Sequence, residues 1–135
     1  MGYRYPWGNT VANHQANYYQ SGDPFEMGFG SGIGTTPVGY YNGSQTPAGV
    51  DMVNGYGLYD IAGNVFQWCW DSYSSTYYAD PTAGSDPHGP STGSNRVQRG
   101  GSWGYDTSYL RCALRDSYPP GNPYDYWGFR CVKAQ

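Results

Sequence analysis

The sequence is poor in charge and contains only one lysine, Lys133. Charged residues make up 13% of its 135 residues, and the formal net charge is −3. Proteins bind nucleic-acid backbones mainly through clusters of lysine and arginine, and no such cluster is visible here. We therefore expect no nucleic acid among the partners of this protein.

Long hydrophobic runs are also absent. No stretch approaches the roughly 20 apolar residues of a membrane-spanning helix, and the first residues, MGYRYPWGN, lack the apolar stretch of a signal peptide. We expect no membrane span. Cysteine is scarce as well, and Cys69, Cys112 and Cys131 allow at most one internal disulfide. That number leaves open both the redox compartment and whether Cys112 and Cys131 pair.

Aromatic residues and turn-forming residues are abundant instead. Aromatics reach 19%, with 16 tyrosines and 5 tryptophans, beside 21 glycines and 10 prolines. Glycine and proline favour turns over long helices, whereas disordered chains are poor in aromatics. This balance predicts one ordered domain, residues 1–135, in which rings pack against irregular loops.

Four segments are expected to form a small sheet. Residues 1–46 keep neither the helical nor the strand period, so we expect an ordered loop held by ring packing. In the run RVQRGGSW, Val97 is expected to point one way and Arg96 and Gln98 the other. The insert DSYPPGNPYDYW is expected not to pair, because it is rich in proline. The predicted strands are Leu58–Asp71, the strongest core segment, then Arg96–Trp103, Leu110–Arg115 and Gly128–Val132.

Several motifs together resemble one family, the formylglycine-generating-enzyme/sulfatase-modifying-factor domain. The motifs are YPWGN, ANY, TTPVGYYNG, NGYGLYDIAGNVFQW, RVQRGGSW, RCALR and GFRC, in this order along nearly the whole chain. The resemblance implies an α+β fold of the C-type-lectin-like class, with a small antiparallel sheet, long irregular loops and little helix. The family's section that normally precedes YPWG is missing, so a truncated domain is expected.

The resemblance also implies a reactive cysteine pair in the run after GGS, where the family's oxidising enzymes bind copper. Here that run, Trp103 to Tyr109, contains no cysteine. Copper(I) prefers thiolates, which hydroxyls do not replace, so no copper is expected. A divergent oxidase that uses Cys112 or Cys131 is kept as an alternative. The two histidines, His14 and His88, lie in unrelated loops and do not indicate an iron site.

Calcium is the expected ion, in a structural role. Asp60 precedes a glycine-containing turn, and its carboxylate could join backbone carbonyls in the oxygen shell that calcium prefers. Family members hold calcium at the matching positions, and the carbonyls would be those of Ile61, Gly63 and Val65. The alternative is an aspartate that accepts hydrogen bonds from backbone amides in its turn.

A second calcium site resembles the one that the family builds on the ANY segment. It would use Asn17 and the carbonyl of Tyr18, completed by an acid of the following loop, either Asp23 or Glu26. Bound metal would then contribute to ordering loops that have few apolar contacts.

Three arginines, Arg99, Arg115 and Arg130, each sit beside a predicted core strand. In a chain with so few charges they suggest an anion site. Guanidinium groups also brace loop carbonyls and stack on aromatic rings, and this structural role is the interpretation we favour.

The loops after GGS use the residues that antibody paratopes use. Tyrosine gives a large contact area at low entropic cost, while serine, glycine and asparagine adapt their hydrogen bonds. The C-terminal region thereby also resembles the variable proteins of diversity-generating retroelements, which share the lectin-like fold. The predicted contact surface comprises Trp103, Tyr105, Asp106, Tyr109, Tyr118, Asn122, Tyr124, Tyr126 and Trp127.

These features favour a non-catalytic binding or display module whose ligand is a protein or a carbohydrate. A self-assembling subunit of a homo-oligomer or filament remains open, because large exposed aromatic patches are unusual on monomers. The divergent oxidase is the third hypothesis.

Overall fold

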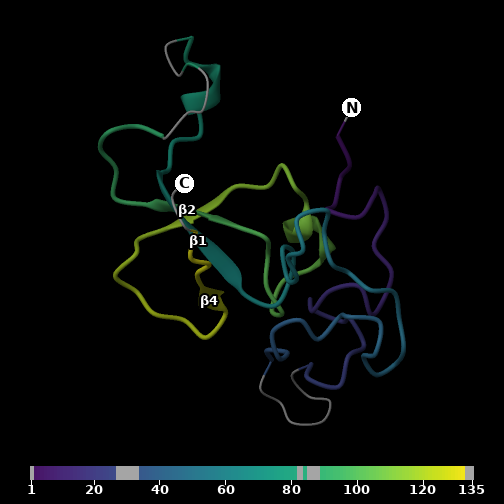
Figure 1. Ribbon diagram of the computed structural model, residues 1–135. Helices are drawn as coiled ribbons and strands as arrows, with labels where there is room; N and C mark the ends of the chain where they lie inside the picture. Colours follow the sequence, from purple (N-terminus) through teal and green to yellow (C-terminus); the bar gives the residue numbers. More distant parts are fainter. Residues whose placement is uncertain (1, 27–33, 82–83, 85–88, 133–135) are drawn as a thin grey trace.

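One mixed sheet organises the protein in the computed structural model, which describes residues 2–26, 34–81, 84 and 89–132 (Figure 1). The strands follow the spatial order β3-β2-β1-β4. Their bounds are Phe66–Ser72 for β1, Arg96–Arg99 for β2, Asp116–Tyr118 for β3 and Trp127–Gly128 for β4. The described helix is limited to two 3-10 turns, η1 (Tyr77–Ala79) and η2 (Thr107–Leu110). The expected small sheet with little helix is thus present.

β1 lies inside the sheet because it pairs with a strand on each side, and both of its ends are buried. Phe66 is buried, with 1% exposure, and Ser72 at the other end of the strand is buried too. The strand pairs antiparallel with β2, where Gln67 faces Arg99 and Trp68 faces Gln98. Its pairing with β4 is parallel, with Phe66 opposite Trp127. The sheet is therefore mostly, and not wholly, antiparallel.

One predicted strand is displaced along the chain, and the insert that was expected not to pair does pair. Leu110–Arg115 is not a strand, since η2 ends at Leu110 and a turn follows; the strand is Asp116–Tyr118, inside the proline-rich insert. The insert pairs at both ends because its prolines lie between β3 and β4 and not within them.

The other three predicted segments are strands over part of their length. Arg96–Trp103 is a strand only as far as Arg99. Leu58–Asp71 is extended only from Phe66, and Gly128–Val132 contributes Gly128 alone, which pairs beside Trp127. In β2 the side chains alternate between the two faces as predicted, but residues on both faces are buried. Val97 is 1% exposed, but Gln98 on the opposite face is also only 2% exposed. β2 is therefore covered on both faces at these two positions.

The long N-terminal region is irregular, as predicted, and is held by rings and polar side chains. Within 2–26 and 34–65 the only ladder contacts are isolated bridges, Tyr5 with Gly8 and Asn42 with Asp51. A buried cluster joins this region to the end of η2, and Trp7 and Val11 pack against it. Its members are Tyr5, Ala16, Tyr18, Ala62 and Leu110.

Asn64 ties the same region to the sheet. Its side chain accepts from the backbone amide of Thr36 at 3.0 Å, and its backbone amide donates to the carbonyl of Asn17 at 2.8 Å. In Figure 1 the early loops gather on one side of the strands as a result. Among the described residues, no helix has the length and apolar character that a bilayer crossing requires.

Candidate functional site

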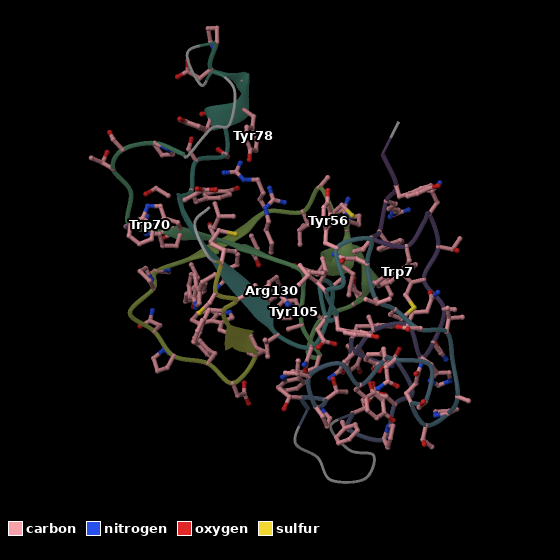
Figure 2. The ribbon with its side chains drawn as sticks, viewed as in Figure 1. Trp7, Tyr56, Trp70, Tyr78, Tyr105 and Arg130 are labelled. Carbon is pink, nitrogen blue, oxygen red and sulfur yellow. The ribbon has the colours of Figure 1, made fainter. Side chains whose placement is uncertain are left out.

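Two rings, Tyr105 just before η2 and Tyr109 within it, pack on the first residue of β1. Phe66 contacts Tyr105 with ring centroids 5.2 Å apart and Tyr109 at 6.2 Å, both edge to face. Tyr105 and Tyr109 lie 4.6 Å apart. Edge-to-face pairs of this kind add to the stabilisation from buried area. The buried strand thereby fixes the position of two predicted contact residues (Figure 2).

A second group of rings surrounds Trp127 in β4. Trp127 lies 5.1 Å from Trp68, 4.7 Å from Tyr118 and 4.6 Å from Tyr124 between ring centroids. Tyr118 and Tyr124 also meet edge to face at 5.9 Å. These residues come from three strands and one loop, so the sheet itself brings them together.

Tyr126 joins the two groups. Its ring lies 5.7 Å from Tyr105 and 6.3 Å from Trp103, and it stacks on Tyr124 at 5.3 Å. Every predicted contact residue with an aromatic ring therefore belongs to one continuous set. We call this set the aromatic network; it comprises Phe66, Trp68, Trp103, Tyr105, Tyr109, Tyr118, Tyr124, Tyr126 and Trp127.

Phe66 and Trp68 were expected in the core strand and not at this surface. The signal that could have found them is the period of a strand, which places residues 66 and 68 on the same face. The rings of the C-terminal region pack on that face, so the side chains of the core strand support the predicted contact residues directly.

Part of the aromatic network is open to solvent. Tyr118 is 39% exposed and Tyr124 is 47% exposed, whereas Tyr105 and Trp127 are half-buried. Paired rings that are held in place and partly exposed lose little entropy on binding. The network thus has a rigid base and an accessible rim.

Two tyrosine hydroxyls of the network, those of Tyr105 and Tyr118, have raised pKa values, which favours their neutral form. Burial, with the neighbouring Tyr126 hydroxyl, raises the pKa of Tyr105 to about 12. A hydrogen bond with Tyr124 raises the pKa of Tyr118. Neutral hydroxyls both donate and accept hydrogen bonds. The rim can therefore meet polar groups of either kind.

Asp106 and Asn122 lie outside the ring contacts. The Asp106 carboxylate caps η2, where it accepts from the backbone amide of Ser108 at 2.7 Å. Hydrogen bonds from Ser108 lower the pKa of Asp106. Asn122 is exposed on the turn that begins at Pro119. Asp106 positions the loop, and Asn122 is free to contact a ligand directly.

Asp60, the acid of the first predicted calcium set, makes hydrogen bonds within the protein. The Asp60 carboxylate accepts from the backbone amide of Gly39 at 2.8 Å. The Asp60 carbonyl accepts from Gln67 at 2.8 Å and from the Arg130 guanidinium at 3.2 Å. A fixed positive charge beside this carbonyl opposes a second cation. The bond from Gly39 is of the kind that the turn-capping alternative expects, and the role of Asp60 as a calcium ligand stays a prediction.

Around this turn, the carbonyls of Ile61, Gly63 and Val65 belong to a closely packed segment. A side-chain carbon on Gly100 would lie 3.0 Å from the Ile61 carbonyl, and the Val65 side chain abuts Gly128. The Gly63 amide donates to the Gly100 carbonyl at 2.7 Å. The segment is ordered by these contacts.

The second predicted set holds an unpartnered oxygen. Asn17 is 1% exposed, and its Oδ1 has no hydrogen-bond partner among the described residues, while its Nδ2 donates to the Gly34 carbonyl at 2.7 Å. An orphaned buried oxygen fits a cation ligand. Among the described residues, the Tyr18 carbonyl beside it accepts only from the Ser21 amide, at 3.0 Å.

The two candidate acids for that set make other contacts. Asp23 accepts from Phe25 at 2.8 Å and from the Tyr41 hydroxyl at 2.9 Å, and Glu26 accepts from the amides of Gln20 and Gly22. No group of three His, Cys, Asp or Glu residues is arranged for metal binding within the described ranges. Asn17 Oδ1 is the predicted side-chain ligand of this set that has no hydrogen-bond partner among the described residues, and calcium at this position stays a prediction.

The three arginines brace loops, as favoured from sequence. Arg99 donates to the carbonyls of Cys112 and Leu114, both at 3.1 Å. Arg115 lies over the rings of Tyr73 and Tyr78, at 5.2 and 4.4 Å. Arg130 donates to the carbonyls of Tyr59 and Asp60 and to the side chain of Gln67, and is labelled in Figure 2.

All three cysteines are free thiols. Cys69 is half-buried in β1, and burial raises its pKa, whereas Cys112 and Cys131 are exposed. The question of a Cys112–Cys131 disulfide is thus answered in the negative for this structure. His88 and Lys133 lie outside the described residues.

Comparison with known proteins identifies the family. The model of the sulfatase-modifying factor enzyme 1-like domain matches residues 1–135. The chain belongs to this family. The formylglycine-generating enzyme of Thermomonospora curvata is 38% identical over 138 residues, which cover 96% of this chain and 42% of that enzyme. The chain therefore spans less than half the length of this relative.

Solved structures place this sulfatase-modifying-factor domain among C-type-lectin-like folds. PvdO from Pseudomonas aeruginosa superposes with a TM-score of 0.61 at 29% identity, covering 89% of this chain and 39% of PvdO. Variable protein 1 of Treponema denticola is 40% identical over 64% of this chain and 33% of its own, with a TM-score of 0.47. The predicted α+β, lectin-like fold class is confirmed.

Proposed function

We propose that this chain is a non-catalytic binding module that contacts a protein or a carbohydrate through the rim of the aromatic network. The observation that carries this proposal is the gathering of every predicted contact ring into one continuous set with two exposed tyrosines, Tyr118 and Tyr124. Aromatic faces pack against sugar rings and against apolar side chains alike. Neutral hydroxyls at the edge supply hydrogen bonds that select between ligands.

The sequence of the loop supports a non-catalytic role. The run from Trp103 to Tyr109 contains no cysteine, although the resemblance to the family's oxidising enzymes implies a pair there. In its place, the run supplies Trp103, Tyr105 and Tyr109 to the network. The run in which the family's oxidising enzymes carry cysteines thus supplies aromatic contact residues in this chain.

The test is a binding screen with two defined probes, a glycan array and a displayed random-peptide library. Wild type is compared with the double variant Tyr118→Ala/Tyr124→Ala and with the control Tyr56→Ala, whose ring is 89% exposed and lies in a separate loop (Figure 2). We expect selected ligands to bind the double variant at least about tenfold more weakly, since central aromatic residues dominate interfaces. Ligands that tolerate the double variant, or that Tyr56→Ala weakens equally, would contradict the assignment.

Two other functions give different results in simple assays. A divergent oxidase would consume oxygen in the presence of copper and a cysteine-containing peptide, and replacement of the exposed Cys112 or Cys131 would abolish that activity. A self-assembling subunit would form ordered particles whose size rises with protein concentration in light scattering. A binding module stays monomeric until ligand is added.

We also propose a structural calcium ion at Asn17 that orders the N-terminal loops. Calcium is expected to raise the thermal unfolding midpoint by several degrees, because a ligand that binds only the folded state stabilises it. The increment is expected to disappear in Asn17→Ala and to persist in Asp60→Ala, since Asp60 already accepts from Gly39. Differential scanning calorimetry with calcium, magnesium or chelator measures it. An increment lost only in Asp60→Ala would move the ion to the other site.

A further inference from the structure

A groove away from the aromatic network concentrates positive charge. It encloses about 630 Å³, and its lining includes Arg99, Arg111 and Arg115 together with Tyr78 and Cys112. Arg99 is paired with Gln67 in the sheet, so its side chain projects from the face opposite to Trp68 and Gln98. The groove therefore does not share its surface with the network.

Each guanidinium in the groove is fixed by one of its nitrogens. Arg111 Nε donates to the Ser108 carbonyl at 2.6 Å, and Arg115 Nη1 donates to the Ser74 carbonyl at 3.4 Å. Arg99 uses Nη1 for both of its carbonyl partners. Within the described residues, Nη2 of all three forms no hydrogen bond. Donors that are held in place thus remain available.

The charge balance of the groove calls for an anion. The chain has a net charge of −3 and only six arginines, yet three of them line this one groove. Guanidinium groups stay protonated, so their mutual repulsion is not relieved by titration. Their partners among the described residues are carbonyl oxygens and tyrosine rings.

Three nearby acids offset this charge only in part. Asp71 acts on the Cys69 thiol together with Arg99 and Arg115. Asp106 interacts with Arg111, although its carboxylate is bonded to Ser108, and Asp116 accepts from the backbone amide of Ser117 at 2.8 Å. None of these acids lines the groove, whereas the three guanidinium groups do, so the groove itself is electropositive.

We propose that this groove binds a multivalent oxyanion, a phosphate or sulfate group, through the unused donors of Arg99, Arg111 and Arg115. Arginine presents planar donor pairs that match such oxygens, and three of them favour a doubly charged group over a single carboxylate. Tyr78, which is labelled in Figure 2, also lines the groove, and the Arg115 guanidinium lies 4.4 Å from the centre of its ring. The site is independent of the proposed function of the aromatic network.

Cys112 supplies a probe that needs no substitution. Iodoacetate and iodoacetamide both alkylate a thiolate with loss of iodide, but only iodoacetate carries a negative charge. We expect the ratio of the two rates to be at least about threefold higher at Cys112 than at Cys131, which is exposed outside the groove lining, because an electropositive cleft concentrates anions. Peptide mass spectrometry measures both sites in one sample. Equal ratios at Cys112 and Cys131 would overturn the proposal.

Competition separates the possible anions. Inorganic phosphate and sulfate are expected to slow the reaction of Cys112 with iodoacetate, whereas acetate at equal ionic strength is not. In Arg111→Gln the protecting concentration should rise about tenfold, as expected for the loss of a charge-assisted contact. Arg96→Gln removes the same charge from the opposite face of β2 and should change nothing. Protection by acetate as strong as that by phosphate, or equal effects of both variants, would show only general ionic screening.

Discussion

Phe66→Ala is expected to lower the free energy of unfolding by about 3–5 kcal/mol, the range for truncating a fully buried aromatic side chain. Phe66 is 1% exposed, and its ring touches both Tyr105 and Tyr109. Its removal leaves a cavity under the loop that follows Trp103. Urea unfolding followed by far-ultraviolet circular dichroism gives the change.

The matched control is Phe129→Ala, which removes the same side chain from a position that is 77% exposed. We expect a loss within about 0.5 kcal/mol, as for most surface substitutions. If Phe66→Ala cost no more than Phe129→Ala, β1 would not be the base of the aromatic network.

Gly63→Ala is the second substitution with a large expected effect, about 3 kcal/mol of lost stability. Gly63 has a φ of +84°, which disfavours a side chain, and an added Cβ would lie 2.5 Å from the Asn17 carbonyl. That carbonyl accepts from the Asn64 amide, so the clash would disrupt the hydrogen bond that connects the early loops to the sheet. The expected result is a lower unfolding midpoint and faster amide exchange in both segments.

Gly55→Ala controls for the change in composition. A Cβ at Gly55 would meet nothing within 4 Å. Such a change is expected to be neutral or to stabilise by about 0.4–1 kcal/mol, because it restricts the unfolded chain. A loss for Gly63→Ala no greater than for Gly55→Ala would mean that the early loops are attached elsewhere.

The core strand could be predicted from sequence because its signal is local. Val65, Phe66, Trp68 and Trp70 are a run of residues that favour strands, bounded by polar residues and glycine. The first residue of the strand could not be predicted, because the backbone before Phe66 makes contacts outside the sheet. There Asn64 has a φ of +66° and bonds to Asn17 and Thr36. Such contacts depend on residues far away along the chain.

The third strand shows the limit of composition as a guide. Proline cannot donate in a ladder, so a proline-rich insert reads as unpaired. The rule acts residue by residue, however, and Asp116–Tyr118 precedes the first proline of the insert. Arg96, Val97 and Gln98 therefore find partners in Tyr118, Ser117 and Asp116.

The contact residues could be listed from sequence because tyrosine and tryptophan are amphipathic, but their grouping could not. β4 runs parallel to β1 and sets Trp127 opposite Phe66. This pairing brings the neighbouring Tyr126 ring into contact with Tyr105, so that Tyr126 joins the two groups of rings. No local sequence pattern predicts a parallel pairing of two strands that is only two residues long. The role of Asp106 also needed the structure, since the same residue can cap a turn or face a ligand.

The close ring contacts have an optical consequence. Phenol emits light at wavelengths that indole absorbs, so excitation of Tyr124 or Tyr126 passes to Trp127 a few ångströms away. Most tyrosine fluorescence of the network is thus converted into tryptophan emission. Any molecule that settles on the exposed rim changes the surroundings of these indoles, and the protein reports its own occupancy without a label.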